Sequence, residues 1–176
     1  GVKIKSPAHS AAASYTLTLP PTDGSVDQVL STDGNGVLDW VNQTGGGSAY
    51  SRTTKSATTA SLNAAASGDL SITAFKAYNL LKVTIDHPAW VRLYVDSASR
   101  TSDASRTEGT DPAPGSGVIA EVLTSTAGAS TFLMSPGVIG WNNDGTPSTT
   151  VYAKVTNKDS QARAITVTLT LIQAEA

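Results

Sequence analysis

Few side chains in this sequence have the types and spacing that catalysis needs. The two histidines are His9, in a Pro/Ala/Ser segment, and His87, which precedes Pro88 in an expected turn. A catalytic base needs a neighbouring group that orients it, and the sequence provides none beside either histidine. Serine is abundant, but no Gly-x-Ser-x-Gly elbow occurs. We therefore predict that the protein is not an enzyme. The alternative is a glycan depolymerase with paired carboxylates such as Glu108 and Glu121.

The residues that could hold a metal or a phosphate are equally sparse. Cysteine is absent, which excludes thiolate zinc sites, disulfide bonds and thiol catalysis. Acidic residues that could hold calcium gather around one long loop, without the Asp-x-Asp-x-Asp-Gly spacing of a calcium loop: Asp96, Asp103, Glu108 and Asp111. The three glycines at 45–47 lack the lysine and the following helix of a phosphate-binding loop. The sequence predicts no metal and no cofactor.

One aromatic cluster has the chemistry of a carbohydrate site. The apolar face of an indole can stack on a sugar ring while neighbouring amides and carboxylates bind its hydroxyls. The candidate residues are Trp141, Asn142, Asn143 and Asp144. Trp90 and Tyr94 share one face of an expected strand and are weaker candidates for stacking. The alternative is that Trp141 lies in the core and the residues after it only form a turn, and the turn-forming composition favours this alternative.

The elements that must position these residues are predicted to be strands. The chain has 176 residues, of which 15% are charged, and Ser and Thr supply about a quarter. This composition favours strands and turns over helices. The net charge of −2 gives no basic footprint for a nucleic acid. No apolar run approaches the roughly twenty residues of a membrane span, and residues 1–5 lack the apolar stretch of a secretory signal. We expect no nucleic-acid partner and no membrane insertion.

Three regions separate by composition: an arm at 1–43, a Gly-rich linker at 44–49 and a larger domain at 50–176. In the arm, residues 15–19 alternate as a strand that ends at Pro20. Residues 28–31 and 37–41 flank Asp-Gly-Asn-Gly at 33–36, which predicts a β-hairpin.

The strands of the arm are too few and too short to enclose a core of their own, and a lone hairpin is only marginally stable in water. Its apolar residues therefore need a partner surface; they are Leu17, Leu19, Leu30, Leu38 and Trp40. The arm either folds onto the domain that follows or packs against copies of itself in an oligomer. We favour the oligomer.

The larger domain contains eight expected strands, at 68–75, 78–86, 90–96, 118–123, 131–134, 138–141, 149–156 and 164–172. Most have one apolar and one polar face; in 78–86 the apolar face is expected to carry Leu81, Val83 and Ile85. Such strands predict an all-β protein whose arm precedes an antiparallel β-sandwich of jelly-roll type. Residues 57–66 are expected to form a turn or a short helix. The loop at 97–117 is long enough to favour a functional role, although its Arg and acidic residues can also pair locally.

Part of the sequence resembles a known group of proteins. Tyr-Thr-Leu-Thr-Leu-Pro-Pro-Thr-Asp-Gly at 15–24, Gln-Val-Leu-Ser-Thr-Asp-Gly at 28–34 and Gly-Val-Leu-Asp-Trp at 36–40 resemble a repeat-like module of bacteriophage tail-fibre and virion appendage proteins. The segments 89–95, 111–121 and 140–147 are similar to β-sandwich knobs of marine phage structural proteins, such as those of cyanophages.

The resemblance implies that the protein is a homotrimer in the virion and contacts other virion proteins. It also implies a role in host attachment, through a surface polysaccharide, or in particle decoration. A single copy of the module implies a short stalk or a docking arm rather than a long shaft. The position in the tail, the collar or the capsid surface stays open, as does the receptor.

Overall fold

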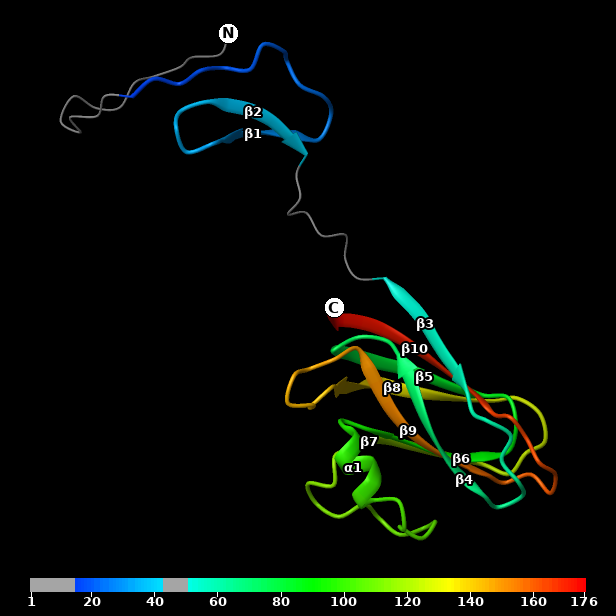
Figure 1. The fold of residues 1–176 in the computed structure, drawn as a ribbon. Coiled ribbons are helices and arrows are strands. Elements are labelled where there is room, and N and C mark those ends of the chain that lie inside the picture. Colours follow the sequence, from blue (N-terminus) through cyan, green and yellow to red (C-terminus); the bar gives the residue numbers. More distant parts are fainter. Residues whose placement is uncertain (1–14, 43–50) are drawn as a thin grey trace. The chain divides into compact units, whose positions relative to one another are not determined.

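The computed structural model describes residues 15–42 and 51–176. By its internal contacts the chain divides into two compact units, Gly1–Ser48 and Ala49–Ala176. The two units are described separately (Figure 1). His9 and the expected linker at 44–49 lie outside the described residues.

The first unit contains the predicted hairpin. Strand β1 (Gln28–Thr32) pairs antiparallel with β2 (Leu38–Asn42). The carboxylate of Asp33 organises the turn, because it accepts hydrogen bonds from the backbone N–H groups of Asn35 at 2.7 Å and Val37 at 3.1 Å. These bonds, that from Asn35 foremost, lower the pKa of Asp33. Gly36 has φ +92 and lies so close to the carbonyl of Thr16 that a Cβ would overlap it.

The expected strand at 15–19 is wrong. The structure forms a single parallel bridge there, between Thr18 and Val37. The N–H of Thr18 donates to the carbonyl of Gly36, and the N–H of Leu38 donates to the carbonyl of Thr18, each at 2.8 Å. Pro20 follows at once, and proline cannot continue a ladder. The segment therefore pairs with the hairpin through a single bridge.

The second unit is an eight-stranded antiparallel sandwich. Its strands are β3 (Arg52–Thr58), β4 (Ser67–Thr73), β5 (Ala77–Ile85), β6 (Ala89–Tyr94), β7 (Val118–Thr124), β8 (Ser130–Trp141), β9 (Thr150–Asn157) and β10 (Thr166–Glu175). One sheet has the order β3-β10-β5-β8 and the other β4-β9-β6-β7. The first strand pairs with the last, the second with the next to last, and so on inward to β6 and β7. This nested pairing is the jelly-roll topology, and it confirms the predicted fold class.

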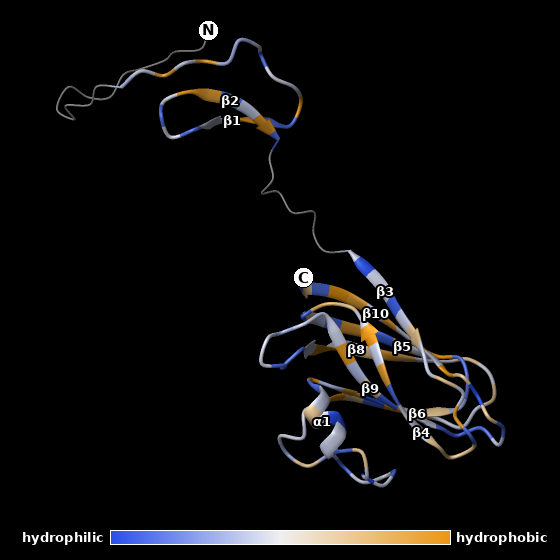
Figure 2. Cartoon of the chain, viewed as in Figure 1, coloured by the Kyte–Doolittle hydropathy of each residue, from blue (hydrophilic) through white to orange (hydrophobic). Residues whose placement is uncertain are grey.

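The core lies between the two sheets. Alternate residues of β4 and of the four central strands point inward and are almost fully buried: Leu70, Ile72, Leu80, Val83, Ile85, Val91, Leu93, Val151, Ala153, Val155, Val167, Leu169 and Leu171. The outward face of the β3-β10-β5-β8 sheet is rich in threonine, with cross-strand hydroxyl contacts between Thr58 and Thr166 and between Thr84 and Thr131. Figure 2 shows hydrophobic residues in the hairpin as well as in the strands of the sandwich.

Three details of the strands differ from the sequence prediction. Strand β3 was missed, because this edge strand carries Thr, Lys and Ser and has almost no apolar alternation. The two short strands expected at 131–134 and 138–141 are parts of one strand, β8. In β5 a register shift between Leu80 and Lys82 turns Leu80, rather than the predicted Leu81, toward the core. Residues 59–66 form a turn and no helix.

The long loop after β6 folds over the outer face of the β4-β9-β6-β7 sheet (Figure 1). It begins with a short helix, α1 (Ser97–Ser102), whose first turn is capped by Asp96 through a 2.6 Å hydrogen bond from the N–H of Ser99. Arg100 of α1 donates to the carbonyl of Leu70 at 3.2 Å and pairs with Asp69 at 3.4 Å. The loop also covers the outward face of β6, where Arg92 and Tyr94 bind Asp103, while the inward residues of β6 lie in the core, so all six residues of this strand are buried. No helix in the described residues is long and apolar enough to cross a membrane.

Candidate functional site

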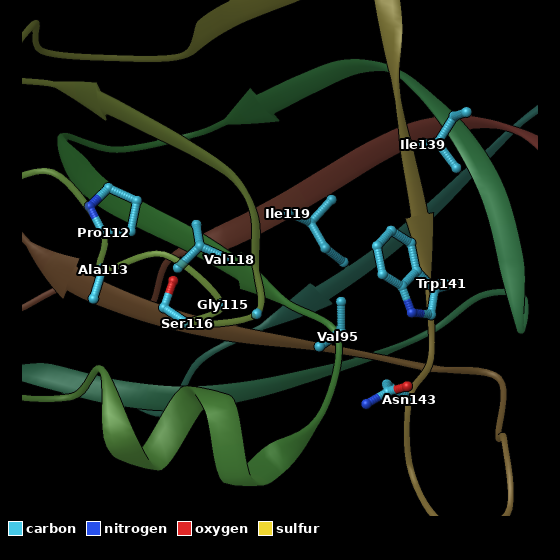
Figure 3. A pocket seen from close by; sticks show the side chains of 11 residues that line it. Val95, Pro112, Ala113, Gly115, Ser116, Val118, Ile119, Ile139, Trp141 and Asn143 are labelled. Carbon is cyan, nitrogen blue, oxygen red and sulfur yellow. The ribbon is translucent and has the colours of Figure 1, made fainter.

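A pocket of about 510 Å³ lies where the β7 and β8 edges of the two sheets meet. The end of β8 contributes Ile139 and Trp141, and the start of β7 contributes Val118 and Ile119. The remaining lining residues come from the end of β6 and from the two loops that meet there: Val95, Pro112, Ala113, Gly115, Ser116, Gly117 and Asn143. Figure 3 shows Trp141 and Pro112 on opposite sides of the pocket, with Ile119 and Val118 between them. The volume lies within the range of small-ligand sites.

Trp141 is the largest side chain in this pocket, and it is 49% exposed. It stands on the outer face of β8 because strand residues alternate between faces, and its neighbour Gly140 points inward. A Cβ on Gly140 would overlap the ring of Tyr78, which is buried in the core. Trp141 is therefore a surface residue, and the alternative that it lies in the core is wrong.

Asn142 and Asp144 have structural roles in the loop that follows β8. The amide of Asn142 is buried and donates to the carbonyl of Thr150 at 2.9 Å and to Asp144 at 3.0 Å. The carboxylate of Asp144 also accepts from the hydroxyl of Tyr152 at 2.8 Å. This hydrogen bond raises the pKa of Tyr152. Both side chains hold the turn that the sequence indicated, and neither lines the pocket.

Asn143 is the second candidate residue that lines the pocket. Its backbone N–H donates to the carbonyl of Val95 at 2.7 Å, which fixes the loop beside β6. Its side-chain amide approaches the carboxylate of Asp96 at 3.4 Å. Among the described residues, no hydrogen bond uses the side-chain oxygen of Asn143, the hydroxyl of Ser116 or the indole N–H of Trp141. The pocket therefore offers one acceptor, one hydroxyl and one donor to a ligand.

Trp90 and Tyr94 cannot stack on a sugar, because both are buried beneath the long loop, at 5% and 1% exposure. Arg92 lies between them on the same face of β6 and is also buried, with its guanidinium 3.9 Å from the ring of Trp90. The prediction that these aromatic residues are candidates for stacking is wrong. No local pattern in the sequence indicates that a loop covers this face.

Asp103 neutralises the buried arginine. Its carboxylate lies 3.2 Å from Arg92 and 2.8 Å from Arg106, and it accepts a 2.7 Å hydrogen bond from Tyr94. Arg106 also pairs with Glu121 on β7. Burial alone would raise the pKa of Asp103, but the hydrogen bonds from Arg106 and Tyr94 and the two positive charges outweigh it and lower that pKa. The Arg and acidic residues of this loop therefore pair with one another locally, as the alternative in the sequence analysis expects.

Glu121 and all the carboxylates proposed for calcium except Asp111 have other partners. Glu108 pairs with Lys158 at 2.8 Å, and Glu121 pairs with Arg106. Asp96 caps α1, and these hydrogen bonds, chiefly from the N–H of Ser99, lower its pKa. In the described part of the chain, no group of three or more His, Asp or Glu side chains could hold a metal ion.

The five arm residues predicted to need a partner divide into two groups. Leu17, Leu19 and Leu30 are 51%, 58% and 44% exposed. Leu38 and Trp40 are partly covered within the arm. The indole of Trp40 donates to the carbonyl of Thr22 at 2.8 Å and packs against Gly24.

Comparisons of the chain with models of protein families, with curated proteins and with solved structures found no match.

Proposed function

We propose that this chain is a non-enzymatic structural protein of a bacteriophage virion, a short fibre or a decoration of the capsid surface. It assembles as a homotrimer through its arm, joins other virion proteins and presents its jelly-roll domain for host attachment. The observation that carries the proposal is the exposed apolar surface of the arm. The resemblance of residues 15–40 to the phage appendage module supports the same function.

The exposed surface of the arm is large for so small a unit. Besides Leu17, Leu19 and Leu30, the exposed apolar residues of this unit are Tyr15, Val26, Val29, Val37 and Val41. Apolar area of this kind marks an interaction site, because its transfer from water favours association. A hollow of about 520 Å³ between residues 15–17 and the hairpin turn adds a recess that a neighbouring chain can fill. Self-association of the arm removes this surface from water.

The charge pairing within the jelly roll suits a structural role. Hydrolysis by paired carboxylates needs two carboxyl groups that face a common substrate. Glu108 and Glu121 are instead each held in an ion pair, Glu108 with Lys158 and Glu121 with Arg106.

Sedimentation of the full chain tests the assembly. We expect a trimer for the wild type and a monomer when Leu17, Leu19 and Leu30 are replaced by serine. The matched control is Leu133→Ser, which changes a leucine that is 75% exposed on β8 and should leave the trimer intact. A wild-type chain that stays monomeric over the whole concentration range would contradict the proposal, as would a trimer that survives the arm substitutions.

A second candidate function is carbohydrate binding at the pocket beside Trp141. The observation that favours it is a half-exposed indole in a pocket that also contains hydrogen-bonding groups without protein partners. An array of host-type glycans tests it, with Trp141→Ala as the negative variant and Leu133→Ala as the control. We expect binding that only the Trp141 substitution removes. If the wild type binds no glycan on the array, this function is rejected.

A further inference from the structure

The chemistry of the lining narrows the class of sugar that the pocket beside Trp141 can take. We infer that it selects an uncharged sugar that carries a methyl group, namely a 6-deoxyhexose or an N-acetylhexosamine, and discriminates against uronic and sialic acids. The inference rests on the proposed carbohydrate-binding function of this pocket. It is argued from the charge, the polarity and the unpaired groups of the lining.

The lining has no charged side chain to pair with an acidic sugar. Ser116 and Asn143 are its polar side chains, and the other lining side chains are apolar or those of glycine. A carboxylate placed in such a site would lose hydration without gaining a cation, which is costly. Binding of an acidic sugar is therefore disfavoured by the site itself.

The charged groups at the margin of the pocket also disfavour an acidic sugar. Asp96 lies behind Asn143 at 3.4 Å, and the hydrogen bonds that lower its pKa keep it negative at neutral pH. Lys76, whose carbonyl accepts a hydrogen bond from the N–H of Asn142, has its ammonium 3.8 Å from Glu175. The nearby lysine is thus already paired, and the carboxylate at the margin repels an anionic ligand.

The apolar walls explain the preference for a methyl group. Trp141 provides a face for a ring, while Pro112, Val118 and Ile119 are among the apolar residues that line the rest of the pocket (Figure 3). A sugar with a hydroxyl on every carbon would press some hydroxyls against these walls without partners. A methyl substituent can contact these apolar walls without losing any hydrogen bond to water. The Asn143 oxygen, the Ser116 hydroxyl and the Trp141 N–H remain for two or three hydroxyls of the ring.

Three glucose derivatives that differ only at carbon 6 provide the test: 6-deoxyglucose, glucose and glucuronate. A second series compares N-acetylglucosamine, glucose and N-acetylneuraminate, the last of which carries both the acetamido group and a carboxylate. Each is titrated into the full-length protein while NMR follows the indole N–H signal of Trp141, which is identified by its loss in Trp141→Ala. Leu133→Ala is the control for a change elsewhere on β8.

We expect the methyl-bearing sugars to bind about three- to tenfold more tightly than glucose, as burial of one methyl group predicts, and the acids to bind more weakly than glucose. The substitution Ser116→Lys should reverse the order of glucuronate and 6-deoxyglucose. If the acids bind as tightly as the methyl sugars, or glucose binds more tightly, the inference fails while carbohydrate binding stands. If no sugar in either series shifts the Trp141 signal, both fail.

Discussion

Arg92 of the jelly roll is a charged side chain with only 1% of its surface exposed. Burying a guanidinium is unfavourable unless a counter-charge and hydrogen bonds accompany it. Asp103 provides both, since its carboxylate and its backbone carbonyl each accept from Arg92. Asp103 also binds Arg106 of the loop and Tyr94 of β6. This one carboxylate therefore connects the long loop to the sheet beneath it.

The substitution Asp103→Asn should destabilise the protein by about 3 kcal/mol, because it leaves the buried Arg92 without its counter-charge. Urea unfolding followed by tryptophan fluorescence measures the change. The control is Glu108→Gln, which breaks a more exposed pair with Lys158 and should cost at most about 1 kcal/mol. Equal effects of the two substitutions would contradict the role assigned to Asp103.

The lowered pKa of Asp103 also predicts a pH dependence. A carboxylate whose pKa is lower in the folded than in the unfolded protein stabilises the fold fully above its ordinary pKa of 3.8. That contribution is lost as the pH falls through the folded-state pKa. The difference in the free energy of unfolding between wild type and Asp103→Asn should therefore narrow below about pH 4. Urea titrations at several pH values check this, and a constant difference would contradict it.

At the scale of elements, the pocket depends on strand β8, which forms one of its walls. This edge strand carries Ile139 and Trp141 outward, and Gly140 lets it approach the ring of Tyr78 on β5. The sequence predicted strands on either side of Pro136 from their alternation. It could not predict that they join, because the pairing with β5 includes a register shift that depends on contacts distant in sequence.

The substitution Gly140→Ala should destabilise the sandwich by about 1 to 3 kcal/mol, because the new methyl group would overlap the buried Tyr78. The matched control is Gly145→Ala, whose Cβ would meet no atom within 4 Å. Thermal unfolding measures both. A Tyr78→Leu replacement in the Gly140→Ala background should recover part of the loss by making room, and the idea fails if Gly140→Ala is as stable as the control.

At the scale of the whole molecule, the hydrophobic core belongs to one unit. Every buried residue of the core cluster lies between Leu70 and Leu171, and the described residues of the arm contribute none. The jelly roll therefore has the burial that independent folding requires. The described part of the arm leaves large apolar side chains exposed, which is why the proposed assembly is assigned to it.

A fragment of residues 49–176 should fold alone and unfold in one cooperative transition. Its midpoint in calorimetry should match that of the jelly-roll transition in the full chain, because the core is complete without the arm. A marked fall of the midpoint in the fragment would show that the arm stabilises the domain. Circular dichroism of the fragment provides a check that the β structure is retained.

The sequence by itself determined the class of the fold. Alternation at period two in β4, β9 and β10 predicted strands with one buried face, and Asp-Gly-Asn-Gly predicted the hairpin turn. It also predicted the turn after Trp141, although the alternative that it favoured placed Trp141 itself in the core. These features are local, because turn residues and the alternation of side chains act within a few residues of one another.

Tertiary structure decided which strands are neighbours and what each outward face meets. Trp90 and Trp141 both stand on outward faces of strands, yet the long loop buries the first and the edge of the sheet exposes the second. Strand β3 has no apolar pattern and exists because the edge of β10 offers it hydrogen bonds. Whether an outward side chain becomes core or binding surface depends on segments far away in the chain, which no local pattern encodes.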